Sequence, residues 1–60
     1  MLLQEFPDIL TVQQMQKALN IGRSWAYRLL DERKISSFRI GRTYKIPKSA
    51  VIDFIRDQAS

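Results

Sequence analysis

The chain contains two short helical patterns separated by three residues, Asn20-Ile21-Gly22, and this break limits its possible folds more than any other feature. Asparagine and glycine both tolerate the left-handed conformation that ends a helix, so the segment predicts a tight turn and not one long helix. Ile21 is expected to pack into the core between the two helices. The sequence therefore predicts a small domain built on a pair of helices joined by a tight turn.

The first helix is predicted to begin after Thr11. The Thr11 hydroxyl suits an N-cap and Gln14 occupies the third helical position, so the two residues form a T-x-x-Q capping box. Residues 1–10 are predicted to be an N-terminal arm, and residues 11–57 the folded domain.

The second helix is predicted to run from about Arg23 to Glu32. Its inner face has i, i+3, i+4 spacing and consists of Ala26, Leu29 and Leu30. The side chains expected to point away from the core in its N-terminal half are those of Arg23, Ser24, Tyr27 and Arg28. Trp25 lies at the margin of the inner face.

The strand-like segment after this helix predicts a β-hairpin. Phe38 and Ile40 share one face of its first strand, and Tyr44 and Ile46 share one face of its second. A two-residue turn would place these pairs on opposite faces, whereas a three-residue loop at 41–43 would unite them. The three-residue loop is the expected one, since it pairs Ile40 with Tyr44 and Phe38 with Ile46. Arg39 and Lys45 would then project from the outer face, and Arg42 from the tip.

The last pattern predicts a third helix. Pro47 suits its first turn, where the missing N–H costs nothing, and Val51, Phe54 and Ile55 form an apolar stripe. The predicted fold class is therefore mainly α with a small β-hairpin: a winged helix-turn-helix of three helices and a two-stranded antiparallel wing.

Charge is segregated along the chain. Residues 23–48 hold eight Lys and Arg against two acidic residues, a net charge of +6, while the remaining residues have a net charge of −2. The positive part coincides with the second helix and the hairpin, as in a surface that binds nucleic acid. Double-stranded DNA is therefore the predicted partner, with the second helix as a recognition helix in the major groove.

The candidate DNA contacts on the helices follow from this placement. Those on the second helix are Arg23, Ser24, Tyr27 and Arg28, and Thr11 is added because the first amides of its helix could meet a backbone phosphate. Two interpretations stay open for Trp25, a core-edge residue or a contact to the DNA backbone. Arg23 and Arg28 could also be ordinary surface charges, and Tyr44 is expected to pack the hairpin and not to stack on bases.

Catalysis, metal binding and cofactors are not predicted. The chain has no histidine and no cysteine, so it lacks the usual general base and the usual soft metal ligands. Asp53 and Asp57 are expected to form a solvated helix face. No apolar run approaches the roughly 20 residues that span a bilayer, so no membrane association is expected. The absence of cysteine makes the cytoplasm the expected compartment.

The chain also resembles a known family. The resemblance lies in Leu10-Thr11-Val12, Ala18-Leu19-Asn20-Ile21-Gly22-Arg23-Ser24, Tyr27-Arg28-Leu29-Leu30 and, most specifically, the stretch from Phe38 to Pro47 with its pattern R-I-G-R-x-Y-x-I-P. These segments, in this order and spacing, are similar to the excisionase family, a small MerR-like group of winged helix-turn-helix domains.

The resemblance implies a function and further contacts. It implies a recombination directionality factor of a mobile element or phage, which bends DNA, recruits an integrase or other recombinase and associates with further copies of itself on DNA. It also implies wing contacts to DNA through Arg39, Arg42 and Lys45. Three departures from the family pattern are Gly22 in place of a serine N-cap, Trp25 in place of a smaller residue, and no glycine between Lys34 and Phe38.

Two alternatives remain at this point. A small MerR-like transcription regulator would use the same DNA-binding surface. A protein-interaction adaptor on the same scaffold would instead use Trp25 and the apolar arm as anchors.

Overall fold

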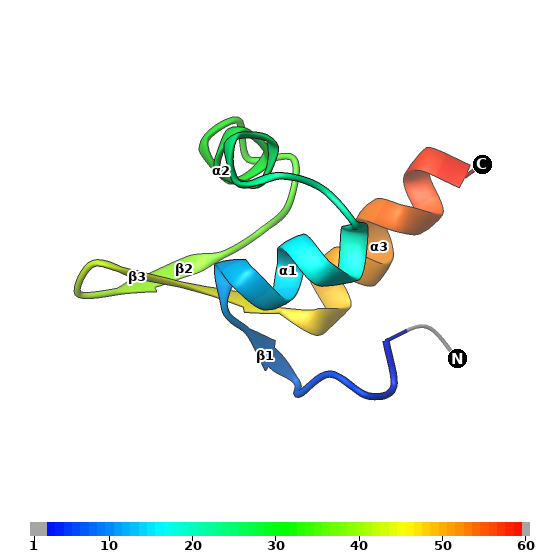
Figure 1. Ribbon diagram of the computed structural model, residues 1–60, viewed down its shortest axis with the longest axis horizontal. Coiled ribbons are helices and arrows are strands. Elements are labelled where there is room, and N and C mark those ends of the chain that lie inside the picture. The colour runs from blue at the N-terminus through cyan, green and yellow to red at the C-terminus, as the bar shows by residue number, and fades with distance from the viewer. Residues whose placement is uncertain (1–2, 60) are drawn as a thin grey trace.

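The computed structural model describes residues 3–59, so the first two residues of the predicted arm lie outside the described range. Three helices and three short strands follow one another in the order β1, α1, α2, β2, β3, α3. Figure 1 shows the β2–β3 hairpin projecting beyond α1 and α2, on the side opposite to the C-terminal end of α3. The predicted winged helix-turn-helix architecture is confirmed.

Helix α1 spans Val12–Leu19, and its start is the predicted capping box. The Gln14 amide donates to the Thr11 hydroxyl at 3.1 Å, and the Thr11 amide donates to Oε1 of Gln14 at 2.9 Å. The helix ends at Asn20, which has φ 55°, and the Ile21 amide bonds back to the Gln16 carbonyl. This is a Schellman ending with asparagine in the left-handed position, as the predicted turn requires.

Helix α2 spans Arg23–Asp31, one residue shorter than predicted, and Gly22 is its N-cap without a side-chain capping bond. Its end is a second Schellman motif, because the Lys34 amide donates to the Leu29 carbonyl and the Arg33 amide to the Leu30 carbonyl. Arg33 takes the left-handed position with φ 58°. An arginine with a Cβ therefore adopts a backbone conformation that favours glycine.

The sheet has one strand more than predicted. β1 (Ile9–Leu10) pairs with β3 (Thr43–Pro47), which also pairs with β2 (Phe38–Ile40), so that the strand order is β1-β3-β2. The end of the predicted arm is therefore a strand of the sheet. Lys48 attaches the preceding segment as well, since its Nζ bonds to the Phe6 carbonyl at 3.0 Å and its amide to the Asp8 carbonyl at 2.7 Å.

The predicted hairpin loop is wrong. The register pairs Ile40 with Thr43, Arg39 with Tyr44 and Phe38 with Lys45, so the turn contains only Gly41 and Arg42. Gly41 has φ 63°. A two-residue hairpin turn with a positive φ at its first residue favours glycine at that position. Here this preference outweighs the tendency of the apolar side chains to share a face.

The register also corrects the predicted facing of the wing. Residues directly opposite one another share a face, so Arg39 lies on the same face as Tyr44, while Lys45 lies on the other face with Phe38. Arg39 and Lys45 therefore do not project from one common outer face, as had been expected from the three-residue loop.

Helix α3 spans Lys48–Ala59. Pro47 is the last residue of β3, opposite Ile9, and not part of the first helical turn as predicted. The expected stripe is confirmed at Val51, which is fully buried, and Phe54 and Ile55 pack against the core.

The core receives side chains from almost every element. Its buried members are Leu10, Met15, Ala26, Leu30, Ile35, Ile46 and Val51. β2 is the exception, since all three of its residues are exposed. A domain of this size buries only about 60% of its unfolded surface and is marginally stable. The wing extends from this core, and its outer strand β2 contributes no buried side chain to it.

Candidate nucleic-acid interface

The outward side of α2 carries the residues that the sequence placed there. Ala26 and Leu30 are buried and fix the orientation of the helix. Arg23, Ser24 and Arg28 are exposed, whereas Tyr27, predicted to point outward with them, is half-buried. Because the N-cap is a glycine without a side chain, no capping group covers the N-terminal turn. A neighbouring chain could therefore approach the first turn of α2 closely.

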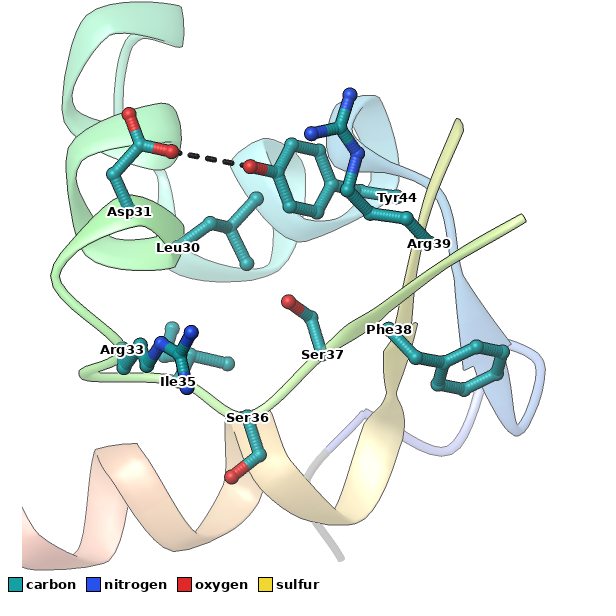
Figure 2. A pocket seen from close by; sticks show the side chains of 9 residues that line it. All are labelled: Leu30, Asp31, Arg33, Ile35, Ser36, Ser37, Phe38, Arg39 and Tyr44. Atoms are coloured by element: carbon teal, nitrogen blue, oxygen red, sulfur yellow. Dashed lines mark hydrogen bonds between the residues drawn. The ribbon is translucent and has the colours of Figure 1, made fainter. Parts of the chain in front are cut away.

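A pair of tyrosines joins α2 to the wing. The rings of Tyr27 and Tyr44 meet edge to face, with centroids 5.9 Å apart and an interplanar angle of 65°. The Tyr44 hydroxyl also donates a hydrogen bond to Oδ1 of Asp31 at 3.1 Å, drawn as the dashed line in Figure 2. Tyr44 thus contacts α2 at two positions one helical turn apart.

Two arginines extend this pair at both ends. The Arg23 guanidinium lies 5.6 Å from the centre of the Tyr27 ring, and the Arg39 guanidinium lies 4.8 Å from the centre of the Tyr44 ring. Figure 2 shows the Arg39 side chain against the Tyr44 ring. The result is a row that crosses from helix to wing, which we call the Arg–Tyr row: Arg23, Tyr27, Tyr44 and Arg39. A cation of the helix and a cation of the wing therefore lie on one continuous surface.

The wing half of the Arg–Tyr row, Tyr44 and Arg39, borders a hollow between α2, the segment after it and the hairpin. The hollow measures about 610 Å³, and Arg33, Ser36 and Ser37 line it together with Arg39 and Tyr44. Figure 2 shows Ser37 pointing into the space between α2 and the hairpin. Hydroxyl and guanidinium groups at such a place can donate hydrogen bonds to an anionic backbone.

Asp31 has a direct effect on Tyr44. The hydrogen bond to Asp31, the partial burial of Tyr44 and the negative charge of Asp31 together raise the pKa of the Tyr44 phenol above the ordinary value of 10.0. The Arg39 guanidinium acts in the opposite direction. The phenol is therefore protonated near neutral pH and is the donor in this bond. No spacing pattern in the sequence indicates this contact, because Asp31 and Tyr44 are 13 positions apart.

Arg28 is held apart from the Arg–Tyr row. Its guanidinium lies 5.1 Å from the centre of the Trp25 ring, and its Nε is 3.1 Å from Oε2 of Glu32. Trp25 is 57% exposed, so it is not a core residue. Trp25 and Arg28 border a second hollow, of about 410 Å³, which Leu29 and Phe54 also line.

The wing presents its cations in different directions. Arg42 is exposed in the turn at the tip, and Lys45 lies on the face opposite to Arg39. A binding partner that surrounded the tip of the β2–β3 hairpin would thus meet positive charge on both faces of the hairpin. This distribution suits a polyanion that surrounds the wing better than a flat partner.

Comparison with known proteins places this surface in a family. Residues 9–59 match the family model described as a helix-turn-helix domain. The chain is 40% identical over 52 residues to the excisionase of Streptomyces ambofaciens, and the match covers 87% of this chain and 84% of that protein. The chain belongs to the excisionase family of helix-turn-helix DNA-binding domains.

A second relative extends the match. The chain is 41% identical over 46 residues to a probable excisionase of Saccharopolyspora erythraea, covering 77% of this chain and 47% of that protein, so it spans about half the length of this relative. No solved structure gives a significant match. The resemblance found in the sequence is confirmed.

Thr11 differs from the other candidate contacts of this excisionase-family domain. Its amide and its hydroxyl both have partners within the capping box. Thr11 fixes the start of α1, and a phosphate contact to the first amides of this helix stays a prediction.

Other kinds of site receive no support from the described part of the chain. Residues 3–59 contain no group of three or more His, Cys, Asp or Glu side chains placed to hold a metal ion. Among the helices of the same range, none is long and apolar enough to cross a membrane.

Proposed function

We propose that this excisionase-family protein binds double-stranded DNA with sequence preference and acts in recombination of a mobile element or phage. α2 is the recognition helix and inserts its exposed face into the major groove, while the β2–β3 wing contacts the neighbouring minor groove and backbone. The observation that carries this proposal is the Arg–Tyr row, because it puts cations of the helix and of the wing on one surface.

The candidate contacts on α2 and on the wing each have a part in this binding mode. The residues of α2 that would contact bases and nearby phosphates are Arg23, Ser24, Trp25, Tyr27 and Arg28. Arginine suits guanine, whose two acceptors in the major groove match its donors. The wing residues that would contact DNA are Arg39, Arg42 and Lys45. They would contact phosphates and so position the protein without reading the base sequence.

The role in recombination, and not transcription alone, is favoured by the two relatives named as excisionases. Among partners, an integrase or other recombinase fits this role, and so does cooperative binding of several copies along one DNA. One domain of this size makes few phosphate contacts, and the affinity would rise steeply when neighbouring copies or a partner act together. The cytoplasm is the compartment where such a protein would meet its DNA.

A salt titration of DNA binding tests the proposal. A duplex enriched by repeated selection from a random pool is compared with an unselected duplex of the same length. Affinities are measured by fluorescence anisotropy between about 50 and 200 mM salt, a range over which binding through phosphate contacts weakens strongly. We expect tighter binding to the selected duplex and a steep fall in affinity with salt for both. Equal binding to both duplexes, or binding that ignores salt, would refute it.

The recombination role has its own test. Selected sequences are compared with the ends of mobile elements, and the protein is added to an excision reaction that contains the matching integrase. We expect excision to depend on the protein. Excision that proceeds equally without it would remove the recombination role and leave a transcription regulator.

A further inference from the structure

The outer face of the sheet carries exposed apolar side chains. Four large hydrophobic residues are exposed in residues 3–59, and three of them belong to the strands: Ile9 at 44%, Phe38 at 46% and Ile40 at 62%. The register puts all three on the face that points away from the core, because their neighbours Leu10 and Arg39 lie on the other face. Figure 2 shows Phe38 pointing away from α2.

The turn is the cause of this exposure. A three-residue loop would have placed Phe38 and Ile40 on the same face as Ile46, which is fully buried. The two-residue turn at Gly41 and Arg42 turns them outward instead. No side chain of β2 belongs to the core, so Phe38 and Ile40 remain exposed.

Ile40 has a special position on this face. It directly precedes Gly41 and so stands at the tip of the wing, beside exposed Arg42. Lys45 lies on the same face, opposite Phe38. An apolar side chain at the tip of a ribbon is thus flanked by two cations.

We propose that Ile40 enters the minor groove of the bound DNA as an apolar wedge and bends the duplex there, with Arg42 and Lys45 on the flanking phosphates. The inference rests on the proposed function and names a deforming contact within it. The minor groove is only about 6 Å wide, so it admits side chains from the tip of a β-ribbon but not the ribbon itself. Isoleucine is among the side chains that minor-groove proteins insert between base steps to kink DNA.

Charge argues for DNA as the occupant of this face and against a second copy of the chain. No acidic residue occurs between Glu32 and Asp53, a stretch that includes the whole wing. Two wings packed face to face about a twofold axis would bring two positively charged surfaces together without compensating charge. Phosphates supply the missing negative charge.

The experiment measures affinity and bending separately. A selected duplex with a fluorophore at each end reports bending by energy transfer, and anisotropy reports binding. Ile40→Ala is compared with Ile9→Ala, a matched control because Ile9 is an exposed isoleucine on the same face, at the far end of the sheet. Ile40→Thr keeps the β-branched shape and shows whether a weakened strand explains the result.

We expect Ile40→Ala to lose most of the bend and about tenfold or more in affinity, because the substitution removes three carbon atoms from an apolar contact. Ile9→Ala should bind and bend like the wild type, and the melting temperatures should agree because both side chains are exposed. An unchanged bend with Ile40→Ala overturns the wedge, and so does a loss confined to cooperativity on a duplex with two sites. Wild-type protein that binds no duplex at all would instead refute the proposed function.

Discussion

The Tyr44 hydroxyl donates a hydrogen bond to Oδ1 of Asp31, which joins the second residue of β3 to the last residue of α2. The same tyrosine meets Tyr27 edge to face, so one wing side chain contacts the helix twice. Because β2 buries none of its residues, the contacts of Tyr44 are a main link between the wing and α2. A protein that uses helix and wing on one DNA needs their relative position to be fixed, since ordering them during binding would cost affinity.

Tyr44→Phe should weaken DNA binding more than it weakens the fold. The substitution removes the hydroxyl that bonds to Asp31 and keeps the ring that meets Tyr27 and Arg39. We expect a small decrease in melting temperature and a clear loss of affinity, measured by calorimetry and anisotropy. Tyr44→Leu, which also removes the ring contacts, should lose more of both. An affinity for Tyr44→Phe equal to that of the wild type would show that the bond does not position the wing.

The same bond predicts a dependence on alkaline pH. The fold raises the pKa of Tyr44 above 10.0, first through the hydrogen bond to Asp31. A raised pKa means that the folded state favours the protonated phenol, so the stabilisation is fully present below the unfolded pKa and is lost as the pH rises through the folded pKa. The difference in melting temperature between wild type and Tyr44→Phe should stay constant up to about pH 9 and shrink above pH 10, close to the ordinary tyrosine pKa. A difference that does not change across this range would contradict the assignment.

Local signals in the sequence predicted most of the helices. The capping box at Thr11 and Gln14 depends on residues three positions apart, and it is present as predicted. The end of α1 at Asn20 follows from the conformation of a single residue. Such features need no knowledge of distant parts of the chain.

The register of the wing could not be predicted in the same way. The prediction assumed that Phe38 and Ile40 would share a face with Tyr44, because burying apolar area is favourable. The turn chemistry at Gly41 determined the outcome instead, and the apolar area remained exposed. Pattern arguments fail where a side chain has a use other than packing, and the proposed wedge would be such a use.

The contacts around Tyr44 were missed for a different reason. Asp31 lies 13 positions away in sequence, and no spacing rule connects a helix end to a strand at that separation. A sign was nevertheless available. Tyr44 shares a strand face with Ile46, two residues later, so its side of the sheet was predictable from the sequence and its partner on α2 was not.

Arg33→Gly should stabilise the domain. Arg33 adopts φ 58° in the Schellman ending of α2, a conformation that costs a residue with a Cβ about 1–2 kcal/mol but costs glycine little. After the greater entropy of glycine in the unfolded chain is subtracted, we expect a gain of about 1 kcal/mol, equivalent to about 4–8 °C in melting temperature. Arg33→Ala serves as the control, since it removes the charge and keeps the strain. Equal melting temperatures for the two variants would show that the conformation is not the cause.

Glu32→Gln should strengthen DNA binding. Glu32 holds the Arg28 guanidinium at 3.1 Å, and both side chains are about half exposed or more. An exposed pair of this kind contributes only about 0–1 kcal/mol to stability, so the melting temperature should change little. In the variant, the Arg28 guanidinium is free to contact DNA, and the Glu32 carboxylate no longer repels the phosphates. We expect affinity to rise about threefold to tenfold at low salt and the gain to shrink at high salt, where such interactions are screened. Asp53→Asn is the matched control, because it removes an equal charge from an exposed position on α3.

Arg28→Ala and Arg42→Ala should weaken binding in different ways. Arg28 lies on the exposed side of the recognition helix, and its loss should remove about 1–3 kcal/mol of discrimination between selected and unselected duplexes. Arg42 lies at the wing tip, so its loss should lower the affinity for both duplexes alike and reduce the slope of log K against log salt by about 1. Competition binding at several salt concentrations separates the two effects. If both substitutions changed only the salt slope, Arg28 would be reading no bases. The groove contact would then have to come from the other half of the helix surface, at Arg23 and Tyr27.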